Sequence, residues 1–130
     1  MTTKLFFISA LILFVLTSCE GETTRTWTVE NNSSSTIYVT SSTYSGSTTA
    51  DSISANQSQI IATDVLDEGT DSEGIPSEEF SSFSISNSSG VFTTKSYQNV
   101  ENWNSTIEQT KNTPATFEHQ YIFTVTDADF

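Results

Sequence analysis

Basic side chains are scarce in this chain, which has 4 Lys and Arg residues against 16 Asp and Glu residues and a formal net charge of -12. So large an excess of carboxylates repels phosphate groups and anionic lipid head groups. The composition therefore excludes nucleic-acid binding through a basic surface, and it also excludes attachment to a membrane by a polybasic patch.

Cysteine and histidine occur once each, as Cys19 and His119. A disulfide within the chain is therefore impossible, and a zinc site made of Cys and His side chains lacks ligands. No Gly-x-Ser-x-Gly motif marks a serine as a nucleophile. We therefore expect a protein without enzymatic activity, in which His119 lies at a strand edge beside Glu118.

The longest apolar run extends from Leu5 to Leu16, follows Lys4 and is interrupted only by Ser9. A run of about a dozen residues has the length of a signal-peptide h-region, whereas a bilayer span needs about 20 residues. We therefore interpret residues 1–18 as an export signal.

The next feature is the tetrapeptide Leu16-Thr17-Ser18-Cys19, which resembles the lipobox of bacterial lipoproteins. The resemblance implies that Cys19 becomes the first residue of the mature protein. It would carry a thioether-linked diacylglycerol and an amide-linked acyl chain such as palmitate, and two or more acyl chains anchor a protein stably. Residues 19–24 would then be a lipidated tether for a domain of residues 25–130.

Beyond residue 24 the chain consists of short alternating segments separated by turns, and helical periodicity is almost absent. This spacing is typical of a β-sandwich. We predict an all-β fold, a single antiparallel β-sandwich with an acidic loop. The predicted strands are residues 25–30, 36–41, 51–55, 58–63, 80–86, 91–97 and 118–126. Residues 99–111 fit a helical face or a strand, and we expect a short helical or irregular segment that leads into a strand.

The alternating faces also predict the core. Trp27 and Val29, for example, share one face of the first strand. Leu66 is the only leucine after residue 18, so aromatic rings must supply much of the buried surface. The predicted core residues are Trp27, Val29, Ile37, Val39, Ile60, Phe83, Ile85, Phe92, Tyr121, Phe123 and Val125.

As a whole, the chain is similar to the small lipoproteins of unknown function that are common in Bacteroidota. The features that carry this similarity are Ser18-Cys19, the turn Asn31-Asn32-Ser33-Ser34, a late Trp103 segment and the ending Tyr121 to Asp127. The resemblance implies a location in the cell envelope at the outer membrane and an Ig-like sandwich, and it implies no activity.

Seven carboxylates and no basic residue lie between Asp64 and Glu79. Oxygen-rich loops of this kind can hold calcium. The EF-hand spacing is absent, however, because placing Gly74 at the sixth position puts Gly69 and Phe80 where carboxylates are required. We expect a solvated, mobile loop and no bound cofactor, with a calcium site as the alternative.

Exposed aromatic rings would be stacking platforms for carbohydrate, and Tyr38, Tyr44, Tyr97 and Trp103 are the available rings. With so few aliphatic residues in the body, we expect Trp27 and Trp103 to be buried instead.

The tripeptide Asp51-Ser52-Ile53 resembles the acceptor sequence for protein O-glycosylation in Bacteroidota. The resemblance makes Ser52 a candidate glycosylation site, and an ordinary strand serine is the alternative.

Together these features predict a non-enzymatic cell-envelope lipoprotein, attached to the outer membrane through Cys19, whose sandwich is a binding or structural module. The alternatives are a glycan-binding accessory lipoprotein and a calcium-dependent adhesin or assembly factor, and the protein or glycan partner stays open. Glu20 and Glu22 partly match the acidic residues that follow the lipidated cysteine of surface-displayed Bacteroidota lipoproteins. The cell surface and the periplasmic face both stay open.

Overall fold

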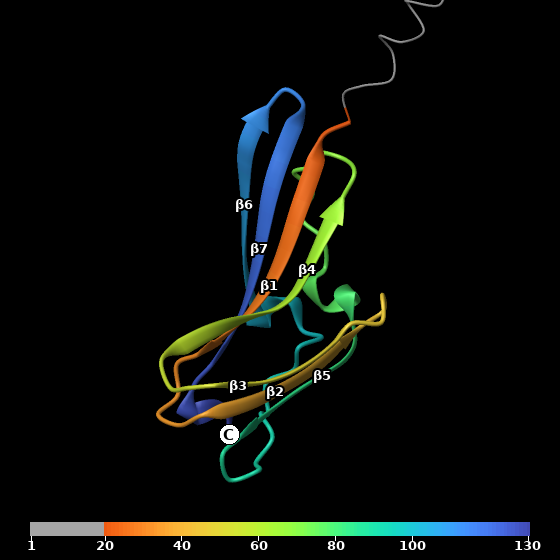
Figure 1. Cartoon of the computed structure of the whole chain (residues 1–130). Coiled ribbons are helices and arrows are strands. Elements are labelled where there is room, and N and C mark those ends of the chain that lie inside the picture. The colour runs from red at the N-terminus through yellow and green to blue at the C-terminus, as the bar shows by residue number, and fades with distance from the viewer. Residues whose placement is uncertain (1–19) are drawn as a thin grey trace, which may run out of the picture.

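The computed structural model describes residues 20–130, which form two packed β-sheets (Figure 1). The four-stranded sheet contains, in spatial order, β4 (Gln57–Leu66), β1 (Glu22–Asn31), β7 (Ala115–Val125) and β6 (Trp103–Asn112). The three-stranded sheet contains β3 (Thr48–Ile53), β2 (Ile37–Thr43) and β5 (Phe80–Asn87). Short 3-10 helices are η1 (Pro76–Glu79), η2 (Val100–Asn102) and η3 (Asp127–Asp129). The predicted all-β sandwich is confirmed, whereas the expected signal and Cys19 lie outside the described residues.

The strand pairs are antiparallel with one exception, because β1 and β7 run parallel with Trp27 opposite Tyr121. β1 and β2 also belong to different sheets. In an Ig constant domain the first two strands are neighbours in one sheet. The two-layer architecture is therefore as expected, but the strand order differs from that of an Ig domain.

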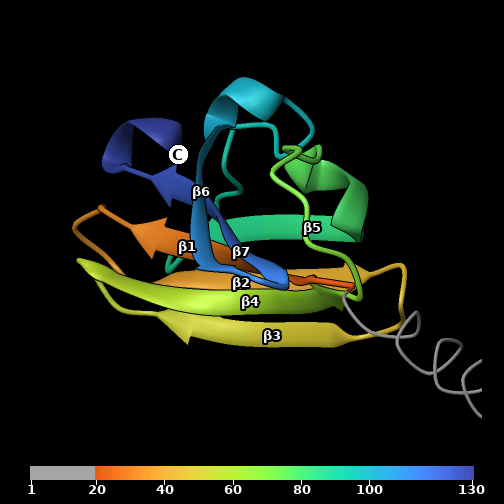
Figure 2. The same ribbon diagram turned by 90° about the horizontal axis from the view of Figure 1, so that it is seen from above.

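The two sheets differ in length and direction. In Figure 1 the upper parts of β6, β7, β1 and β4 stand upright, while β3, β2 and β5 run across below them, and Figure 2 shows the same arrangement from above. The three-stranded sheet thus covers only the lower part of the longer sheet. Another part of the chain must cover the upper part of its inner face.

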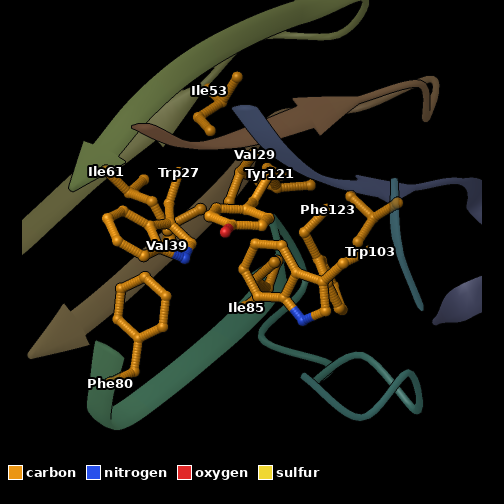
Figure 3. Packing of buried hydrophobic residues seen from close by; sticks show 12 residues of the cluster. Trp27, Val29, Val39, Ile53, Ile61, Phe80, Ile85, Trp103, Tyr121 and Phe123 are labelled. Carbon is orange, nitrogen blue, oxygen red and sulfur yellow. The ribbon is translucent and has the colours of Figure 1, made fainter. Parts of the chain in front are cut away.

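The core lies where the two sheets overlap (Figure 3). Rings dominate it: the centroids of Trp103 and Phe123 are 5.0 Å apart, and those of Trp27 and Tyr121 are 5.3 Å apart. Phe83 is partly buried against this cluster. The buried apolar residues are Trp27, Val29, Ile37, Val39, Ile53, Ile61, Phe80, Ile85, Trp103, Tyr121, Phe123 and Val125.

Two predicted core residues are exposed. The sequence predicts Ile60 as an inward residue, but the pairing of β1 with β4 shifts between Trp27 and Thr28, and this irregularity makes Ile61 the inward residue. Phe92 is 66% exposed, because residues 91–97 do not form the predicted strand. A single bridge pairs Phe92 with Ser86 before the chain leaves the sheet.

The neighbours Ile60 and Ile61 provide a matched stability test. Ile61 is 4% exposed and Ile60 is 55% exposed. Ile61→Ala should lower the free energy of unfolding by about 2–4 kcal/mol, while Ile60→Ala should change it by about 0.5 kcal/mol or less. Urea denaturation measures both values, and equal losses would contradict this strand register.

The structure also tests the predicted bounds of two segments, the start of the domain and residues 99–111. β1 begins at Glu22, three residues before the expected start of the domain, and Thr23 is already fully buried. The segment between Cys19 and the sandwich is therefore shorter than the predicted tether of residues 19–24. The ambiguous residues 99–111 form η2 followed by β6, which confirms a short helical segment that leads into a strand.

Candidate functional site

The predicted acidic loop, residues 64–79, consists of the end of β4, an irregular stretch and η1, and it is called the acidic segment below. It covers the upper inner face of the four-stranded sheet. The Oγ1 of Thr23 donates to the carbonyl of Glu68 at 2.7 Å and accepts from the amide of Thr70 at 2.9 Å. At the other end, Trp27 Nε1 donates to the carbonyl of Pro76 at 2.9 Å. The backbone of this segment is thus fixed to β1 by specific hydrogen bonds. The expectation of a mobile loop is therefore wrong, because the open half of the sheet needs this cover.

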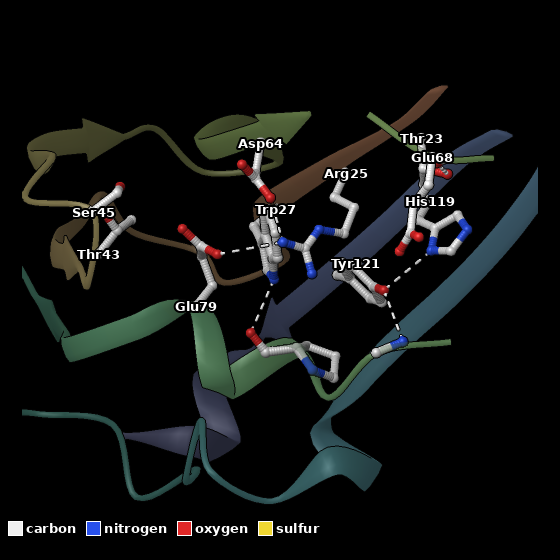
Figure 4. A network of polar contacts seen from close by, with 12 residues as sticks. Thr23, Arg25, Trp27, Thr43, Ser45, Asp64, Glu68, Glu79, His119 and Tyr121 are labelled. Carbon is white, nitrogen blue, oxygen red and sulfur yellow. Dashed lines mark hydrogen bonds and ion pairs between the residues drawn. The ribbon is translucent and has the colours of Figure 1, made fainter. Parts of the chain in front are cut away.

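His119 lies in the same contact (Figure 4). It belongs to β7, which has neighbours on both sides, and its side chain is 1% exposed, so the expected strand-edge position is wrong. Nε2 lies 2.8 Å from the carbonyl oxygen of Thr70, and Nδ1 lies 3.4 Å from Tyr121 Oη. The amide of Gly74 donates to the same hydroxyl at 3.3 Å.

One arrangement of hydrogens satisfies this whole group. A carbonyl oxygen only accepts, so His119 Nε2 donates to Thr70. Nδ1 then accepts from the hydroxyl of Tyr121, and that oxygen accepts from the amide of Gly74. His119 therefore has a complete set of partners and holds the acidic segment on the sheet. Buried polar groups that are paired in this way stabilise one arrangement of the chain.

Two glycines allow a close approach at the end of the sandwich where β1 begins. A Cβ atom at either Gly21 or Gly69 would collide with the backbone carbonyl of Ala115. Three segments that are distant in the sequence therefore meet here, because two of them lack side chains.

Arg25 lies beside two carboxylates on the inner side of this cover. Its Nη2 pairs with Asp64 Oδ2 and lies 4.0 Å from Glu79 Oε2. Its guanidinium also lies 5.3 Å from the centroid of the Trp27 ring. Burial and the carboxylate of Asp64 raise the pKa of Glu79, and the positive charge of Arg25 opposes this shift.

The raised pKa of Glu79 predicts a pH dependence. Where the pKa is higher in the folded state, the folded state binds more protons. The stability from Glu79 is then fully present below the unfolded-state pKa and is lost as pH rises through the folded-state pKa. The stability of the wild type relative to Glu79→Gln should therefore fall as pH rises above the ordinary pKa of a glutamate, about 4.3. Denaturation curves on both sides of this pH measure the difference, and a constant difference would contradict the assignment.

The acidic side chains of this segment do not gather around one point. Asp64 and Glu79 are half-buried beside Arg25, whereas Asp67, Glu68, Asp71, Glu73 and Glu78 are exposed. Within residues 20–130, no group of three or more His, Cys, Asp or Glu side chains could hold a metal ion.

The outer face of the β3-β2-β5 sheet is uncharged. The pairing places three cross-strand rows on it, and each row is centred on β2 at Tyr38, Thr40 or Ser42. The outer face of the other sheet, in contrast, carries Glu30 on β1 and the opposed pair Glu108 and Glu118. The residues of the uncharged outer face are Thr48, Ala50, Ser52, Tyr38, Thr40, Ser42, Ser82, Ser84 and Ser86.

The other candidate residues from the sequence are dispersed. Ser52 is exposed on the edge strand β3, where an enzyme could reach it, and its glycosylation stays a prediction. Tyr38 and Tyr44 are 51% and 76% exposed. Trp103 is buried as expected, and its Nε1 donates to the carbonyl of the partly buried Tyr97. Of the four rings considered for carbohydrate, the structure thus leaves Tyr38 and Tyr44 most open to solvent.

Sequence reasoning missed Phe92 as a surface residue, because its alternating neighbours suggested a strand. The outward position of Tyr38 could be predicted from the sequence, since Tyr38 alternates with the inward residues Ile37 and Val39. The signal for the uncharged outer face was therefore present in β2 but not in the segment after β5.

With this geometry defined, the molecule can be compared with known proteins. No family model, curated protein or solved structure gives a significant match to the chain. The class that the fold defines is thus a two-sheet β-sandwich with one parallel strand pair. In residues 20–130 there is no helix of the length and apolar character needed to cross a membrane.

Proposed function

We propose that the protein is a cell-envelope lipoprotein, anchored in the outer membrane through lipids on Cys19, whose sandwich is a non-enzymatic binding or structural module. The observation that carries the proposal is the short distance along the chain between the lipobox-like residues and the fold. Only Glu20 and Gly21 separate Cys19 from β1, which begins at Glu22. An anchor at Cys19 would therefore act directly on a folded body.

Such an anchor would also orient the sandwich. The three residue steps from Cys19 to Glu22 span at most about 11 Å. β1 starts at the end of the sandwich that holds the β6–β7 turn, whereas the three-stranded sheet lies toward the opposite end (Figure 1). The anchored end would thus face the membrane, and the uncharged outer face would stand away from it.

The anchored end contains an open pocket of about 430 Å³ whose lining includes Glu20, Glu22 and Asp67. These carboxylates would repel anionic head groups over about 8 Å at physiological salt. The repulsion would keep the body beside the bilayer rather than pressed into it.

Cell fractionation tests the anchor. Cys19→Ala should move the protein from the membrane fraction to the soluble fraction, because one residue would carry all of the acyl chains. Glu20→Gln, the matched control, keeps the cysteine and should stay in the membrane fraction. Membrane-extracted protein that retains Met1 by mass spectrometry would contradict the proposal, as would membrane-bound Cys19→Ala protein.

The side of the outer membrane on which the sandwich lies is a separate question. Glu20 and Glu22 match the acidic residues of surface-displayed lipoproteins only in part. Protease treatment of intact cells decides it. Degradation in intact cells would place the sandwich at the cell surface, and degradation only after the outer membrane is opened would place it in the periplasm.

A further inference from the structure

We infer that the outer face of the β3-β2-β5 sheet binds an uncharged polysaccharide chain, with Tyr38 and Phe92 as the two stacking platforms. The inference rests on the binding-module part of the proposed function and is independent of the lipid anchor.

The two rings belong to one cross-strand row. Tyr38 lies opposite Ser52 on one side and opposite Ser86 on the other. The isolated bridge pairs Ser86 with Phe92 on the far side of β5. Directly opposed residues on neighbouring strands point to the same face, so these four side chains share the outer face of the sheet. Phe92 and Tyr38, at 66% and 51% exposure, are open to a ligand.

The spacing of the rings suits an extended sugar chain. Tyr38 and Phe92 are separated by two strand spacings, which is about 9–10 Å. This distance corresponds to the length of about two sugar units in an extended polysaccharide, so the rings would meet alternate sugars. Ser86 lies between them and is small enough to leave the path free.

A hollow lies beside each ring. Next to Tyr38 is a depression of about 340 Å³ that also involves Thr40, Ser52 and, on the edge strand β3, the exposed carboxylate of Asp51. Next to Phe92 is a second depression of about 200 Å³ beside β5, which is lined by Ser84, by the inward-facing Phe83 and Ile85, and by Lys95 and Tyr97. A sugar could therefore sit against each ring with hydroxyl groups beside it, and hydroxyls both donate and accept hydrogen bonds.

The composition of the face selects the class of ligand. Its outward residues are all Ser, Thr, Ala or Tyr, although the chain has 16 acidic residues. An anionic polymer would be repelled by the rest of the molecule, whereas an uncharged one would not. Serine is depleted in protein interfaces, whose cores are more apolar than this face. The chemistry therefore favours a neutral polysaccharide over a protein partner.

Calorimetry with detergent-solubilised full-length protein tests the inference. The probes are a soluble β-glucan, a xylan and a mannan, with polygalacturonate as the anionic comparison. We expect at least one neutral polymer to bind and polygalacturonate not to bind. Tyr38→Ala and Phe92→Ala should each weaken that binding about tenfold, because each removes one stacking contact.

Tyr44→Ala is the matched control. Tyr44 is 76% exposed in the turn between β2 and β3, away from the row, so its removal should leave the affinity unchanged. Thermal unfolding of all three variants should match the wild type, which separates lost binding from lost folding.

Four results would overturn the inference. They are the absence of binding to every neutral polymer, equal binding of polygalacturonate, unchanged affinity in both Tyr38→Ala and Phe92→Ala, and equal weakening by Tyr44→Ala. A concentration-dependent dimer that both row variants abolish would instead identify the face as a contact between two copies. None of these results affects the fractionation of Cys19→Ala, so failure here is distinguishable from failure of the anchor.

Discussion

Phe123→Ala should lower the free energy of unfolding by about 3–5 kcal/mol. This is a large fraction of the total free energy of unfolding of a typical domain, which is about 5–15 kcal/mol. Phe123 is fully buried on β7. Its ring centroid lies 5.0 Å from that of Trp103 and 5.4 Å from that of Phe83, so the substitution opens a cavity between both sheets. Alanine cannot fill this space, and the surrounding rings belong to strands that can relax only partly.

Ile122→Ala is the matched control, because Ile122 is the next residue on β7 and lies on the opposite face, where it is half-buried. Its loss should cost about 1 kcal/mol or less. Urea denaturation of both variants provides the comparison. Equal losses would mean that the two faces of β7 are not distinguished as the structure shows.

Most of the strands and most of the core could be predicted from the sequence because their signals are local. Alternation along one strand determines which side chains share a face, and this is how Trp27, Val29 and Phe123 were assigned correctly. The failures come from features that involve two segments. The bulge that turns Ile61 inward depends on how β4 pairs with β1. The sequence of β4 alone makes both Ile60 and Ile61 candidates for burial, and the predicted core includes Ile60.

The parallel pairing of β1 with β7 is another feature of this kind. No local pattern distinguishes a parallel neighbour from an antiparallel one in two half-buried strands, since both alternate with the same period. The strand order therefore required the three-dimensional structure. The expected Ig-like order came from a resemblance that concerns short motifs, and such motifs do not determine which strands become neighbours.

The candidate sites were predictable to different degrees. Tyr38 could be placed on the outer face from β2 alone, whereas Phe92 could not, because its position depends on a single bridge to Ser86. The sequence predicts the acidic segment as a solvated, mobile loop because charged side chains favour contact with water. Its carboxylates are mostly exposed, but its backbone carbonyls and amides bind Thr23, His119 and Tyr121. Composition describes side chains, so it could not reveal a segment that is held through its main chain.

His119→Ala tests this main-chain attachment and should lower the free energy of unfolding by about 2–4 kcal/mol. The substitution leaves a cavity at a fully buried position, and it leaves the Thr70 carbonyl without its donor and the proton of the Tyr121 hydroxyl without its acceptor. The loss should also be partly local, because the acidic segment would be released from the sheet while the Phe123 region stays packed.

Amide hydrogen exchange separates the local effect from the global one. In His119→Ala, the amides of Thr70 and Gly74 should exchange faster than the decrease in global stability explains, because their acceptors lie in the disrupted contact. Asp71→Asn is the control: it changes an exposed acid of the same segment and should alter stability by about 0.5 kcal/mol or less. If exchange at Thr70 and Gly74 rises only as much as exchange throughout β5, His119 stabilises the fold as a whole and does not specifically hold the acidic segment. A selective rise would show that one buried histidine closes the half of the sandwich that the short sheet leaves open.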